Sequence, residues 1–97
     1  MNENEIEMMF HACNVCQALV RNISNNFLSV SFALTRSKLI DLKISLESAT
    51  LTDYNLIEDF VAELSALYEY DCVGNVLIVE GSEHLPLSNL VYLRSSD

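Results

Sequence analysis

The chain has 97 residues, 51% of them hydrophobic, and its fourteen acidic and five basic residues give a net charge of −9. This apolar content is enough to build a core, which excludes a disordered or low-complexity protein. The length permits a single acidic domain, residues 1–97. The negative charge argues against direct contact with nucleic acid, because phosphates attract basic surfaces.

The compartment is predicted from three negative features. No run of about 18 apolar residues is present, so we expect no contact with a membrane through a spanning helix. The N-terminal residues are acidic, whereas a secretion signal begins with positive charge. The three cysteines are an odd number without the spacing of a disulfide framework. We therefore expect a cytoplasmic protein with reduced thiols.

The first predicted element is a helix over residues 3–22, with acidic side chains in its first turns, where they favour the positive end of the helix dipole. His11 lies beside its apolar stripe and is expected to face solvent. The stripe itself has spacings of three and four, so we expect it to face the core; it consists of Ile6, Met9, Phe10, Cys13, Cys16, Val20 and Ile23.

Two strands are predicted next, over residues 28–34 and 40–47, because apolar and polar side chains alternate in both. Residues 35–38 between them are expected to form a hairpin loop. The alternation indicates that each strand has one buried and one polar face.

The second helix is predicted to begin after Thr52 as its N-cap and to end near Gly74, which suits a left-handed cap. Its apolar stripe is expected to face the core and consists of Leu56, Ile57, Phe60, Val61, Leu64, Leu67 and Tyr68. Residues 76–79 form a continuous apolar run, typical of a strand covered on both faces. Residues 90–93 form the last predicted strand, and residues 95–97 a frayed tail.

The predicted order is α-β-β-α-β-β. Two helices can then cover one face of a four-stranded, mainly antiparallel sheet. The expected fold class is α+β, a two-layer sandwich.

Sulfur and histidine side chains are the first candidates for chemistry. Cys13 and Cys16 have the spacing of a zinc-binding pair, but a second close pair is missing, so we interpret them as core residues. Cys72 and His84 form the one loop pair that could supply a nucleophile and a base, and no glycine-rich oxyanion loop accompanies them. Phosphate-binding glycine motifs are absent as well. We predict no enzyme activity, no cofactor and no metal.

The acidic side chains provide the stronger functional hypothesis. Lys and Arg are absent from residues 44–93, and the carboxylates of the second helix lie mainly off its apolar stripe. One interpretation is that these carboxylates only keep the protein soluble and that the tyrosines are partly buried at the helix ends. The functional one is a surface for a basic partner, predicted to comprise Asp53, Tyr54, Glu58, Asp59, Glu63, Glu69, Tyr70 and Asp71.

These observations favour a small acidic binding or inhibitor protein inside the cell. An immunity protein that neutralises a basic nuclease toxin fits best, because such a toxin must be positive to bind nucleic acid. A phage-encoded inhibitor of a bacterial defence complex, acting as a polyanion mimic, would use the same charge. A small acidic secretion chaperone is a further alternative, although its surfaces are apolar and its usual pattern has additional elements. A structural or regulatory phage protein is the fourth.

Overall fold

A computed structural model describes residues 2–81 and 83–94 of the chain. It confirms the predicted order of elements, while the predicted tail at residues 95–97 lies outside the described residues. The elements are α1 (Glu3–Leu19), β1 (Phe27–Leu34), β2 (Ile40–Leu46), α2 (Leu51–Ala66), β3 (Val73–Glu80) and β4 (Asn89–Leu93).

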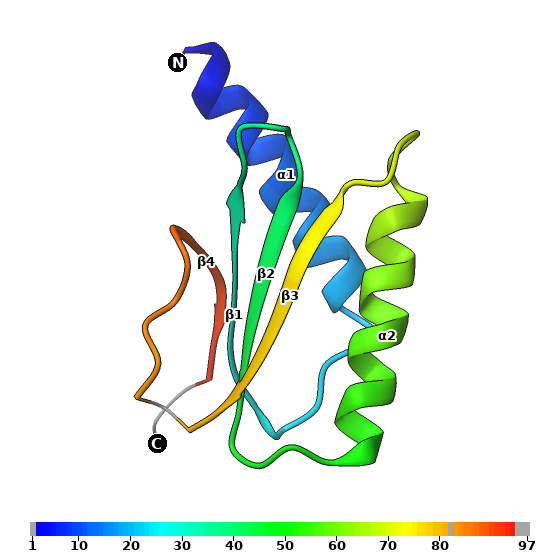
Figure 1. Cartoon of the computed structure of the whole chain (residues 1–97), viewed down its shortest axis with the longest axis vertical. Helices are drawn as coiled ribbons and strands as arrows, with labels where there is room; N and C mark the ends of the chain where they lie inside the picture. Colours follow the sequence, from blue (N-terminus) through cyan, green and yellow to red (C-terminus); the bar gives the residue numbers. More distant parts are fainter. Residues whose placement is uncertain (1, 82, 95–97) are drawn as a thin grey trace.

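The four strands form one mixed sheet in the order β3-β2-β1-β4 (Figure 1). β1 is antiparallel to both β2 and β4, whereas β2 and β3 are parallel. A parallel pair cannot be joined by a tight turn, and α2 provides the crossover between its two strands. The predicted α+β sandwich with a mainly antiparallel sheet is therefore confirmed.

The predicted hairpin joins β1 and β2. Val30 lies opposite Ile44 and Phe32 opposite Leu42, and all four side chains are buried on the same face of the sheet. The connecting turn contains Lys38, whose φ of 67° is left-handed. The clean alternation in sequence thus fixes both the register and the buried face, because a slip by one residue would turn every apolar side chain outward.

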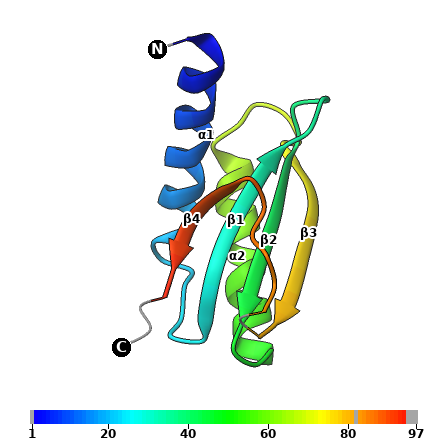
Figure 2. The same ribbon diagram turned by 90° about the vertical axis from the view of Figure 1, so that its left-hand side faces the viewer.

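Both helices pack against this apolar face, which gives the two layers (Figures 1 and 2). α1 contributes Val15, Ala18 and Leu19 to the core, and α2 contributes residues from one stripe that includes Phe60. Residues 83–88, which lead to β4, cross the opposite face of the sheet (Figure 2). There Lys43 Nζ donates to the Leu85 carbonyl at 2.6 Å, and the Leu87 N–H donates to Ser31 Oγ at 2.9 Å.

The buried face of α1 differs from the prediction. Most of the stripe that was expected in the core faces outward: Phe10 is 56% and Val20 73% exposed, and Cys13 and Cys16 are exposed as well. Ile23 is the member of the stripe that is half-buried against the core. His11, expected in solvent, is only 4% exposed. The reason is that α1 carries a second apolar face, at Met8, Ala12, Val15, Ala18 and Leu19, and this face packs on the sheet.

Two further boundaries are corrected by the structure. The N-cap of α2 is Thr50, two residues before the expected Thr52. Gly74 lies inside β3, where its lack of a side chain matters because a Cβ there would collide with the Asp41 carboxylate.

The exposure of β3 also differs from the prediction. β3 is an edge strand and is not covered on both faces, since Leu77 is half-exposed. Neither described helix is long and apolar enough to cross a membrane.

Candidate protein-binding surface

The outer face of α2 presents two of the six acidic side chains that were predicted to bind a partner. Ile57, Phe60 and Leu64 fix the orientation of the helix because they are buried against the sheet. Glu58 and Asp59 therefore lie on the exposed side. We call the exposed residues Tyr54, Glu58 and Asp59 the α2 acidic face.

The carboxylates of this face are not neutralised within the described part of the chain. The ion pairs found there join Lys38 Nζ to Glu7 Oε1 at 3.0 Å and Arg94 Nη1 to Glu47 Oε2 at 2.9 Å. Lys43 is held by the Leu85 carbonyl. None of these cations is paired with Glu58 or Asp59, so the α2 acidic face keeps its negative field.

Glu63 occupies a different position from Glu58 and Asp59. It is exposed but lies on the flank of α2 that faces the end of α1, where it lines a groove of about 430 Å³ together with Arg21. Ala18, Val20 and Leu67 contribute apolar walls to the same groove. Because the positive side chain of Arg21 lies in the same groove, Glu63 adds less to the negative field than Glu58 and Asp59 do.

Asp53 does not belong to the exposed surface, which corrects the prediction. The residue is 3% exposed, and its carboxylate accepts hydrogen bonds from Thr50 Oγ1 at 2.7 Å, Ser24 Oγ at 2.7 Å and Asn26 Nδ2 at 2.5 Å. Burial alone would raise the pKa of Asp53, but these hydrogen bonds outweigh it and lower the pKa. The carboxylate therefore ties the start of α2 to the loop after α1.

The three remaining predicted residues follow the end of α2. Glu69, Tyr70 and Asp71 are all exposed, in the turn that leads to β3. Tyr70 Oη donates to the Lys38 carbonyl at 3.2 Å, which fixes this turn against the hairpin. The structure thus places these residues beyond the helix, at the end where the basic hairpin approaches.

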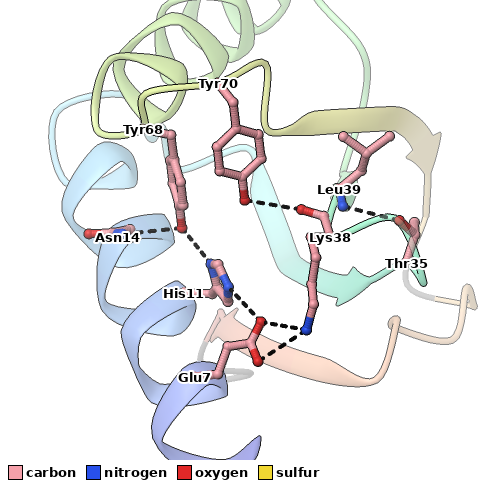
Figure 3. Close-up of polar contacts among 8 residues, drawn as sticks. All are labelled: Glu7, His11, Asn14, Thr35, Lys38, Leu39, Tyr68 and Tyr70. Atoms are coloured by element: carbon pink, nitrogen blue, oxygen red, sulfur yellow. Dashed lines mark hydrogen bonds and ion pairs between the residues drawn. The ribbon is translucent and has the colours of Figure 1, made fainter.

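A polar network that the sequence analysis missed connects α1 to the end of α2 (Figure 3). Tyr68 Oη accepts from Asn14 Nδ2 at 3.1 Å and lies 2.6 Å from His11 Nδ1, and His11 Nε2 lies 3.7 Å from Glu7 Oε1. Since the hydroxyl accepts from Asn14, its own proton can be donated to Nδ1. The signal in the sequence is the spacing of residues 7, 11 and 14, which places three polar side chains on one side of a helix.

This network is structural in character. The hydrogen bond from Lys38 lowers the pKa of Glu7 and keeps its carboxylate charged. Burial raises the pKa of the Tyr68 hydroxyl, so it remains protonated and is a weak nucleophile. His11 also stacks on the Tyr68 ring at a centroid distance of 5.6 Å. The carboxylate, imidazole and hydroxyl therefore join two elements of the fold.

The cysteines do not assemble into a site with the histidines. Cys72 is buried, and burial raises the pKa of its thiol, while His84 is exposed and its Nε2 lies 2.9 Å from the Glu80 carbonyl. Over residues 2–81 and 83–94, no three His, Cys, Asp or Glu side chains are close enough together to hold a metal ion. Cys13 and Cys16 were expected in the core, but the structure places both on the exposed side of α1.

Comparison with known proteins adds no relative: no family model matches the sequence, and no curated protein matches it.

Proposed function

We propose that the protein is a small acidic binding protein that docks on a basic protein through the α2 acidic face. In its most specific form, the partner is a nuclease toxin and the chain is the matching immunity protein. The observation that carries the proposal is the pair of exposed carboxylates, Glu58 and Asp59, on a rigid helix without an ion-pair partner among the described residues.

Opposite charge on the two partners affects both the rate and the specificity of docking. A nuclease needs positive charge to bind phosphates, and an opposite field steers its encounter with an acidic protein. Tyr54 is exposed one helical turn before Glu58 and offers a ring of large contact area with little side-chain entropy to lose. The buried stripe of α2 holds the face in place before binding, which reduces the entropic cost of docking.

The test is a pair of single charge reversals with equal effect on net charge. Glu58→Lys changes the α2 acidic face, whereas Glu83→Lys changes an exposed residue of the segment that crosses the opposite side of the sheet. Affinity capture from the native cell, followed by binding measurements with the recovered protein, compares both variants with the wild type. We expect Glu58→Lys to weaken binding on the order of tenfold or more, because it brings like charges together.

Two results would contradict the proposal. The first is a partner that is not basic, and the second is equal binding by Glu58→Lys and Glu83→Lys. The immunity form is tested separately, because it requires that the wild-type protein inhibit cleavage of nucleic acid by the captured partner. Binding without such inhibition would be consistent with docking through the α2 acidic face but would contradict the role as an immunity protein.

A secretion chaperone is the second candidate, and the exposed apolar face of α1 is the observation that favours it. Ionic strength distinguishes the two. Docking by charge slows steeply as salt is added, because exposed charges are screened over about 8–10 Å at physiological salt. Binding of an apolar cargo segment changes little. A salt-independent complex would therefore favour the chaperone.

A further inference from the structure

The outer face of α1 carries an apolar band that remains exposed in the described chain. We call this band the α1 stripe; its six residues are Ile6, Met9, Phe10, Cys13, Cys16 and Val20, all exposed. Single exposed apolar side chains are common on protein surfaces. A contiguous band is different, because patches of this kind mark interaction sites. At 1.5 Å per residue the α1 stripe extends over about 21 Å.

The residues of the α1 stripe are arranged almost symmetrically about Cys13. Phe10 and Cys16 lie three residues to either side of it, and Ile6 and Val20 lie seven residues to either side. A two-fold axis through Cys13 therefore places Phe10 of one copy beside Cys16 of another, and Ile6 beside Val20. A surface that matches itself in this way is what an isologous dimer requires.

The charges at the two ends of the α1 stripe define the direction of the pairing. Glu3 and Glu5 lie at its beginning and Arg21 at its end, all exposed, and none of them forms an ion pair within residues 2–81 and 83–94. In an antiparallel pair, the acidic turn of each helix lies near the arginine of the other. A parallel pair would instead bring the acidic turns together, which is unfavourable.

We propose that the α1 stripe is the interface of a homodimer, in which the α1 helices of two copies pack antiparallel about an axis at Cys13. The contact is led by apolar burial, because two chains of charge −9 repel each other overall. Added salt therefore does not dissociate the dimer, in contrast to the docking proposed for the α2 acidic face. The homodimer stands or falls independently of that function.

The first test measures the oligomeric state of the purified full chain by sedimentation velocity over a wide range of concentrations. We expect a concentration-dependent dimer that Val20→Glu converts to a monomer without change in its circular dichroism. Leu77→Glu is the matched control, because it introduces the same charge at another exposed apolar residue, on the β3 edge. A wild-type monomer at every concentration, or a dimer that Leu77→Glu dissociates, would overturn the proposal.

The second test locates the two-fold axis by disulfide formation at one or the other of the two exposed cysteines. With oxidised glutathione as the electron acceptor, Cys16→Ser should form a covalent dimer through its remaining exposed thiol at residue 13. Cys13→Ser should not, because the two copies of Cys16 lie about 9 Å apart along the helices, from the rise per residue, beyond the reach of a disulfide. Cys72 is buried in both variants and does not compete. Equal cross-linking of both variants would reject the axis at Cys13.

Discussion

The two helices of this protein have opposite outer faces. α2 buries Ile57, Phe60 and Leu64 of its predicted apolar stripe and presents Glu58 and Asp59 outward, as its sequence predicts, while Leu67 of the same stripe is exposed. α1 has two apolar faces and buries the one with smaller side chains, at Val15, Ala18 and Leu19, so that larger ones such as Phe10 remain outside. Apolar periodicity therefore shows which side chains favour burial, but it does not show whether the same chain or a second one buries them.

The largest difference between the two helices is expected when one phenylalanine of each is truncated to alanine. Phe60→Ala in α2 removes a fully buried ring and should cost about 3–5 kcal/mol of unfolding free energy, from the lost transfer energy and the cavity. Phe10→Ala in α1 should cost the monomer far less, because that ring is more than half exposed. Urea unfolding at a dilution that favours monomer measures both. Equal losses would show that the α1 stripe is buried within the chain.

A medium effect is expected at the start of α2. Asp53→Ala removes three hydrogen bonds to a buried carboxylate and should cost about 1–3 kcal/mol. Asp59→Ala, on the exposed face, should cost less than about 0.5 kcal/mol. Urea unfolding of the two variants at neutral pH measures the difference. A similar loss in both would contradict the inward placement of Asp53.

Lowering the pH tests the role of Asp53 further, because the stability of the wild type and of Asp53→Ala should depend differently on pH. The pKa of Asp53 is lowered on folding, so its stabilising contribution is present above its ordinary value of 3.8 and is lost as the pH falls through the lower folded value. The wild type should therefore destabilise more steeply than Asp53→Ala below that pH. Urea unfolding across this range measures the two slopes.

The smallest effect concerns the contact between the helices. Tyr68→Phe removes the hydroxyl that contacts His11 and Asn14. The buried imidazole and the half-buried amide lose that partner, which should cost about 1–2 kcal/mol of unfolding free energy. Tyr70→Phe is the matched control and removes a single exposed hydrogen bond to Lys38. Thermal unfolding of the two variants should rank Tyr68→Phe well below Tyr70→Phe. The reverse order would contradict the internal role of the network in Figure 3.

The parts of the fold that could be predicted are those with one apolar face. β1, β2 and α2 each have one, so periodicity alone defined what they bury. β3 could not be placed in this way, because a continuous apolar run is typical of a fully covered strand, and the edge position depends on the sheet order. The outer face of α1 was assigned wrongly for the same kind of reason, since two apolar faces competed for one sheet.

The candidate surface was predictable only as far as helical spacing reaches. Glu58 and Asp59 lie off the apolar stripe, and the structure places both outward. Asp53 resembles them in sequence, but its hydrogen-bonding partners Ser24 and Asn26 come from a loop 29 and 27 residues away. Contacts over such a separation leave no periodic signal. Only the fold shows which carboxylate is internal.

The position of β4 has a consequence for the order in which the molecule can be completed. This five-residue strand pairs with β1 on the side opposite β2, and it reaches that place by passing across the whole sheet from β3. During synthesis, β1 therefore leaves the ribosome more than fifty residues before its second neighbour exists. Until then its outer edge offers unpaired backbone groups to any other chain. The nascent protein thus has an edge open to mispairing that β4 covers in the finished fold.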